Sequence, residues 1–182
     1  MPRDPELAAR ERKAVSAPAQ IAWVRDADAA RTAAAFFAAQ LATQPDYISH
    51  GEVLAGRSED GRTFAPDLDQ VVAAEFAAAA QEAEPMIAAA RAPDGAIVGI
   101  AVVAWAKGLR MRYAVLEDLV VAAAARGEGR GAAMLAFIER EARSRGARWL
   151  LLESGRENAG AHRFFERHGF RQTSCIFMKP LG

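Results

Sequence analysis

The stretch that decides the fold is "LEDLVVAAAARGEGRGAAML", residues 116–135. It contains an apolar run, three glycines at alternate positions (Gly127, Gly129 and Gly131) and the start of an amphipathic segment that ends near Gly146. This pattern predicts a strand, a tight loop and a helix. The first N–H groups of a helix lack acceptors, and glycine lets a ligand approach them closely. We therefore expect an anion such as a phosphate to bind at this turn.

Three other interpretations of the glycines have to be weighed. A P-loop needs a Lys-Ser/Thr pair after its last glycine, whereas Gly131 is followed by Ala132 and Ala133. A dinucleotide fingerprint needs glycines spaced one and then three residues apart in an early βαβ unit, whereas this loop follows three expected antiparallel strands. On the glycines alone, a flexible loop without a ligand stays open. The surrounding elements must therefore decide.

The rest of the chain predicts a single α/β domain at 21–182, preceded by an extension at 1–20 that forms a mobile arm or a surface helix. Residues 44–66 form a long irregular connection, which is often functional. We expect a mixed, mostly antiparallel sheet of six to seven strands flanked by about four helices. The expected strands are 21–25, 85–92, 96–106, 113–121, 148–153 and 170–180, and the expected helices are 26–42, 67–83, the segment from the glycines to 146, and 158–169.

Composition and charge exclude several classes of protein. The 182 residues are 52% hydrophobic, which is enough for one core, and the zero net charge argues against nucleic-acid binding. No run of 18 apolar residues predicts a membrane span. The lone Cys175 cannot form an internal disulfide, and we expect it to be buried in the last strand. Because the first 20 residues lack an apolar signal region, we expect a cytoplasmic protein without a membrane partner.

The residues around the glycines resemble the GCN5-related N-acetyltransferase (GNAT) superfamily. "RGEGRG" at 126–131 matches its Arg/Gln-x-x-Gly-x-Gly/Ala signature, and Asn158, Ala161, Phe164 and the "HGF" at 168–170 are similar to its second signature. The resemblance covers 114–170 by motif and 21–180 by element order. It implies that acetyl-CoA binds here as the cosubstrate. The residues expected to hold it are Leu119, Val120, Val121, Arg126, Gly127, Glu128, Gly129, Arg130, Gly131, Ala132, Asn158, Ala161 and Phe165.

The same resemblance implies direct transfer of acetyl to a primary amine. A backbone N–H near Val120 or Val121 would polarise the thioester carbonyl. Glu117, a carboxylate in an otherwise apolar strand, is the candidate base; the alternative is a strand carboxylate held by a salt bridge or facing solvent. By strict alternation along a strand, Asp118 points to the opposite face and is the weaker candidate.

The proton donor departs from the family pattern. Many relatives have a tyrosine where this sequence has Phe165, which leaves the role of general acid to water, to Tyr47 or to Tyr113. Tyr47, His50 and Glu52 in the long connection are candidates for binding the acceptor, with a polar surface cluster as the alternative. The histidines lack the spacing of zinc ligands, so no metal is expected.

We therefore expect an acetyl-CoA-dependent N-acetyltransferase whose acceptor is a small-molecule amine. Two alternatives stay open. One is acetylation of a protein N-terminus or lysine; the other is a CoA-binding sensor or interaction domain with little turnover, which only the missing tyrosine supports. A homodimer is also left open.

Overall fold

The computed structural model describes residues 19–82, 84–179 and 181, so nearly all of the predicted N-terminal extension lies outside the described residues. The described chain forms one five-stranded sheet in the order β1-β2-β3-β4-β5. Strands β1 to β4 are antiparallel to their neighbours, and β5 is parallel to β4. The mixed, mostly antiparallel sheet is confirmed. The strands are β1 (Gln20–Trp23), β2 (Met86–Arg91), β3 (Ile97–Lys107), β4 (Arg112–Val121) and β5 (Ala147–Leu152).

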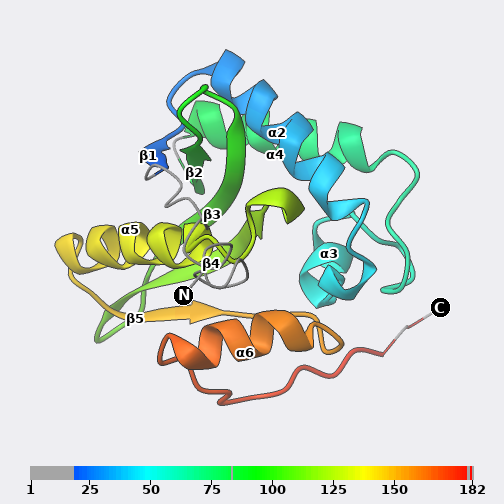
Figure 1. Ribbon diagram of the computed structural model, residues 1–182. Coiled ribbons are helices and arrows are strands. Elements are labelled where there is room, and N and C mark those ends of the chain that lie inside the picture. The colour runs from blue at the N-terminus through cyan, green and yellow to red at the C-terminus, as the bar shows by residue number, and fades with distance from the viewer. Residues whose placement is uncertain (1–18, 83, 180, 182) are drawn as a thin grey trace, which may run out of the picture.

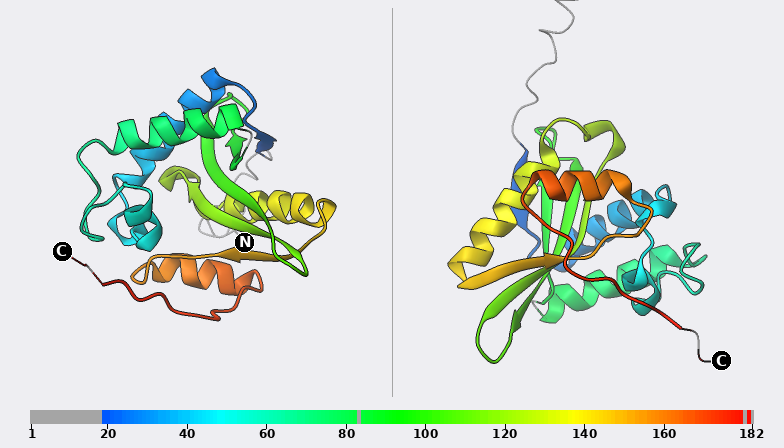
Figure 2. Two further views of the ribbon diagram at one scale, coloured as in Figure 1. Left: turned by 180° about the vertical axis from the view of Figure 1, so that it is seen from behind. Right: turned by 90° about the horizontal axis from the view of Figure 1, so that it is seen from below.

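Helices cover both faces of the sheet (Figures 1 and 2). On one face α2 and α4 pack together, with Phe37 and Phe76 stacked at 5.4 Å between ring centroids. On the other face α5 buries Met134, Leu135 and Ile138 against alternate residues of β2, β3 and β4. Each such side chain contributes about 1.5–3 kcal/mol. The helices are α2 (Ala27–Leu41), α3 (His50–Leu54), α4 (Leu68–Glu82), α5 (Arg130–Ser144) and α6 (Ala159–Arg167), with 3-10 turns η1 (Pro45–Tyr47) and η2 (Ala123–Ala125).

A β-bulge in β4 determines where the site forms. Val102 of β3 pairs with Asp118 and Val103 pairs with Leu116, so Glu117 is the extra residue. A bulge bends its strand and interrupts the alternation of side chains. Leu116 accordingly packs on the α5 face of the sheet, whereas Val120 packs with α2 and α4. The bulge therefore changes which residues in the second half of β4 face each side of the sheet.

β4 and β5 part at the same point. Their parallel pairing ends at Leu116 opposite Leu152, while β4 continues to Val121. Among the strands that the structure describes, the second half of β4 therefore has no neighbour on its β5 side. Backbone groups that leave a ladder in this way need other partners or a ligand.

The predicted strand at 170–180 is wrong. Residues 170–179 pair with no strand, and the sheet of the described chain has five strands instead of six or seven. Side chains at 171–179 are exposed, including 95% of Phe177, and Cys175 is exposed instead of buried. A β-type run of residues becomes a strand only with a hydrogen-bonding neighbour, and this segment has none among the described residues.

The connection at 44–66 is more ordered than expected. It contains η1 and α3, and Ser49 caps α3 in a reciprocal capping box with Glu52. Its ordered backbone lies beside the splayed strands, where it forms one wall of the site. No helix in the described part of the chain is long and apolar enough to cross a membrane.

Candidate functional site

The divergence of β4 from β5 opens a cavity of about 960 Å³. Its walls are β4, the glycine loop with the first turn of α5, one face of α6, and residues 44–57. It brings together most residues that the sequence predicted. Those lining it are Tyr47, Glu52, Glu117, Leu119, Val120, Val121, Arg126, Gly127, Gly129, Arg130, Gly131, Ala132, Asn158, Ala161 and Phe165. Glu128 and His50 are not among the lining residues.

The alternate glycines have two different structural reasons. Gly127 and Gly129 both adopt φ of 78°, a left-handed conformation that costs other residues about 1–2 kcal/mol. Gly131 instead allows a close approach, because a Cβ there would lie 3.3 Å from the ring of Phe164 on α6. Gly129 is the N-cap of α5, and no side chain caps this helix. The helix therefore presents backbone donors to the cavity.

Three arginines line the part of the cavity beside the glycine loop and the N-terminus of α5, which we call the α5 end. Arg126 lies along the loop, where its Nε donates to the carbonyl of Val121 at 3.1 Å and its Nη2 donates to Gln44 at 2.6 Å. Arg130 on the first turn of α5 and Arg167 on α6 also line the cavity. Together with the positive end of the α5 dipole, they make this end suited to an anion.

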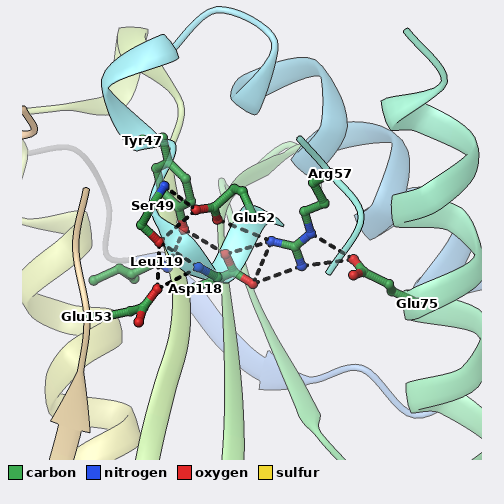
Figure 3. A network of polar contacts seen from close by, with 9 residues as sticks. Tyr47, Ser49, Glu52, Arg57, Glu75, Asp118, Leu119 and Glu153 are labelled. Carbon is green, nitrogen blue, oxygen red and sulfur yellow. Dashed lines mark hydrogen bonds and ion pairs between the residues drawn. The ribbon is translucent and has the colours of Figure 1, made fainter. Parts of the chain in front are cut away.

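Carboxylates line the part of the cavity formed by β4, α4 and residues 44–57, which we call the acidic end. Three of these carboxylates, each from a different element, surround the buried side chain of Arg57 (Figure 3). The guanidinium binds both oxygens of Asp118 at 3.1–3.2 Å and an oxygen of Glu75 at 2.8–2.9 Å, and Glu52 lies 3.7 Å away. It also lies over the ring of Phe37, 5.1 Å from the centroid. Arg57 thus ties the long connection to β4 and α4.

Tyr47 links this network to the backbone of β4. Its hydroxyl donates to Asp118 at 2.8 Å and accepts from the N–H of Leu119 at 3.3 Å. Burial, followed by the charge of Asp118, raises the pKa of Tyr47 well above its ordinary value. The hydroxyl proton is therefore held tightly. The N–H of Leu119 points out of the sheet at the point where β4 and β5 have parted.

Glu117 lies in the bulge, is exposed, and lines the cavity. Although the residue is exposed as a whole, the cavity wall partly desolvates its carboxyl group, and this raises its pKa above the ordinary value; the charge of Asp118 raises the pKa further and Arg57 partly offsets this. Asp118 lines the same cavity, as does every residue from Val115 to Val121. The bulge breaks the strict alternation from which its weaker rank was predicted. Asp118 is buried and ion-paired, whereas Glu117 is open to the cavity.

A second polar cluster lies where β5 ends. Glu153 accepts from the N–H of Gly51 at 3.0 Å and contacts the hydroxyl of Ser49 at 2.5 Å and Nδ1 of His50 at 2.7 Å. His50 thus touches a residue that lines the cavity without lining it itself. This cluster ties α3 to the splayed edge of the sheet.

Sequence reasoning missed Arg57, Glu75 and Glu153. Arg57 and Glu75 look like ordinary surface charges in an irregular connection and an alanine-rich helix, and no local pattern distinguishes them. Glu153 could have been noticed, because it is a carboxylate that directly follows the apolar run of an expected strand, in "LLLE" at 150–153.

Known proteins resemble this chain in sequence and in fold. The acetyltransferase (GNAT) family profile matches residues 54–170. The aminoalkylphosphonate N-acetyltransferase of Salmonella typhimurium is 38% identical over 66 residues, which are 36% of this chain and 43% of that protein. A Bacillus halodurans transcriptional regulator has a TM-score of 0.65 at 18% identity, covering 90% of this chain and 99% of that one. An aminoglycoside N-acetyltransferase in complex with CoA has a TM-score of 0.62 at 15% identity, covering 90% and 94%.

Proposed function

Because the chain belongs to the acetyltransferase (GNAT) family, we propose that it transfers an acetyl group from acetyl-CoA directly to a primary amine of a small molecule. The observation that carries the proposal is one cavity whose two ends have opposite charge. Backbone donors and arginines lie at the α5 end, and carboxylates lie at the end formed by β4 and residues 44–57. An anionic cofactor and a cationic acceptor would meet between them.

The α5 end fits the pyrophosphate of acetyl-CoA. The helix lacks a side-chain cap, the left-handed glycines keep side chains out of the loop, and Arg126 lines the wall. Val121, Ala161 and Phe165 add apolar wall suited to the thin arm that links the pyrophosphate to the thioester. When bound, acetyl-CoA supplies the activated acetyl group. The protein holds and orients it.

Glu117 is the proposed general base. Its carboxylate is open to the cavity, and its raised pKa brings it nearer to the range in which a base accepts a proton readily at neutral pH. For the thioester carbonyl, the N–H of Leu119 is the proposed donor, beside the expected positions Val120 and Val121, because it points out of the sheet where the strands part. Tyr47, its present partner, would have to yield that N–H.

The leaving thiolate needs no dedicated acid in this account. Phe165 cannot donate a proton, Tyr47 donates its own to Asp118, and Tyr113 is not among the residues that line the cavity. A thiol of ordinary pKa, about 8.5, leaves as a stable thiolate compared with an alkoxide. Water can then supply the proton.

The wall formed by residues 44–57 supports a small acceptor. This wall includes α3, which borders the acidic end. The contact between Ser49 at the start of α3 and Glu153 after β5 holds the helix in place. The Salmonella relative named above is an aminoalkylphosphonate N-acetyltransferase, whose name denotes a small amine as acceptor. A peptide acceptor would need an open groove across the same region.

The test is release of free CoA thiol from the purified protein, acetyl-CoA and a panel of amines, with the acetylated product identified by mass spectrometry. We expect thiol and product in equal amounts with at least one small amine. A sensor domain would bind acetyl-CoA in calorimetry yet release no thiol above the rate without protein. Product only with peptides would reject the small acceptor and keep the acetyl transfer.

A further inference from the structure

The acidic end of the cavity carries more negative charge than one amine can use. Five carboxylates line it, and Arg57 is the one guanidinium that the cavity lining places among them. The carboxylates are Glu52, Glu75, Glu117, Asp118 and Glu153. The cationic side chains at the other end belong to the glycine loop, α5 and α6.

Acetyl transfer itself makes this excess a problem for a simple monoamine. The attacking nitrogen must lose its proton before it reacts, and the amide product is neutral. A pocket of carboxylates therefore binds the protonated, unreactive form of a monoamine better than the form that reacts. Binding that weakens on the way to the transition state slows the chemical step. A second cationic group that stays protonated keeps its attraction throughout.

The structure offers one carboxylate suited to that second group. Asp118 and Glu75 are already paired with Arg57, and Glu52 is buried in the capping box of α3. Glu153 is partly exposed at the cavity wall, and within the described residues neither lysine nor arginine forms an ion pair with it. Its contacts are with the neutral donors of Ser49 and Gly51 and with His50.

We propose that the acceptor carries a second cationic group, which stays protonated during the reaction and which Glu153 holds while Glu117 takes the proton from the attacking amine. This inference rests on the proposed function and narrows its substrate class to diamines, polyamines and other amines with more than one positive charge. It disfavours acceptors with an anionic group such as a phosphonate, because the carboxylates at the acidic end would repel that group.

The test compares amines of one length. Cadaverine carries an amine at each end of a five-carbon chain, and n-pentylamine carries only one; aminoethylphosphonate provides an anionic probe. We expect kcat/KM for cadaverine to exceed that for n-pentylamine by at least tenfold, since one charge-assisted contact contributes about that much or more. Calorimetry without cofactor should give the same order of affinities.

Two variants locate the effect. Glu153→Gln should remove most of the preference for cadaverine, measured as the ratio of kcat/KM for cadaverine to that for n-pentylamine in the same variant, so that a loss common to both amines cancels. Glu157→Gln is the matched control, because Glu157 is exposed in the following loop and is not among the lining residues. It should keep the full preference.

Equal rates with cadaverine and n-pentylamine, or faster turnover of aminoethylphosphonate, would overturn the inference while acetyl transfer stands. A cadaverine preference that survives Glu153→Gln would overturn the role of Glu153. If acetyl-CoA binds and no amine is acetylated, the proposed function itself fails and the inference fails with it. These outcomes are distinguished by whether the thiol of CoA is released and by which amine supports its release.

Discussion

Replacement of Arg57 by methionine should destabilise the protein strongly. Methionine keeps much of the length of the side chain and its contact with Phe37 but removes the charge. Asp118 then remains buried at 4% exposure, with the hydroxyl of Tyr47 as its remaining side-chain donor among the described contacts. Breaking a buried ion pair from one side costs about 3–5 kcal/mol. A domain of this size loses about 2–4 °C of melting temperature per kcal/mol, so Arg57→Met should melt about 6–20 °C lower than the wild type.

Urea unfolding followed by circular dichroism at pH 7 measures the loss. The double variant Arg57→Met/Asp118→Asn serves as the control, because it removes the stranded charge. We expect it to be more stable than Arg57→Met alone. A loss below about 1 kcal/mol, or a double variant no more stable than Arg57→Met, would show that water solvates Asp118 and that Arg57 does not hold the connection to β4.

Three further changes test the cofactor end. Gly131→Glu should abolish acetyl-CoA binding in calorimetry, because the new side chain meets Phe164 and brings a negative charge to the N-terminus of α5; unchanged affinity would place the pyrophosphate elsewhere. Arg126→Ala should weaken binding by about 10- to 100-fold, the value of one charge-assisted contact, and no weakening would limit Arg126 to its bonds with Val121 and Gln44. Phe165→Tyr should change kcat by less than about threefold, and a larger rise would show that proton donation limits turnover.

Local signals in the sequence predicted the elements that carry the cofactor end. The glycine loop follows from residues that tolerate φ of 78°, and α5 follows from an apolar stripe that the structure buries. Asp26 and Asn158 cap α2 and α6 with their side chains. These features depend on neighbours within a few positions, where periodicity and capping rules apply.

The acidic end could not be predicted in the same way. Ser49 meets Glu153 across 104 positions of the chain, and Tyr47 meets Asp118 across 71. Neither pairing leaves a periodic trace in the sequence. The bulge at Glu117 was missed for a related reason, because it depends on the register of β3 against β4.

The central claim is that Glu117 takes the proton of an amine in a cavity that binds acetyl-CoA independently of this residue. Only the ionised carboxylate can accept a proton, and burial raises the pKa of Glu117. In the wild-type protein, kcat/KM should therefore rise with pH through the raised pKa of the base or the pKa of the amine.

The most direct measurement is the pH profile of kcat for Glu117→Gln beside the wild type, with acetyl-CoA affinity measured by calorimetry. General base catalysis typically contributes 10²- to 10⁴-fold. We predict that kcat falls by about a hundredfold or more near neutral pH, that acetyl-CoA affinity stays nearly unchanged, and that the loss shrinks at high pH, where free amine is plentiful. An unchanged kcat with a raised KM for the amine would contradict the claim, because Glu117 would then hold the charge of the substrate and leave its proton to water.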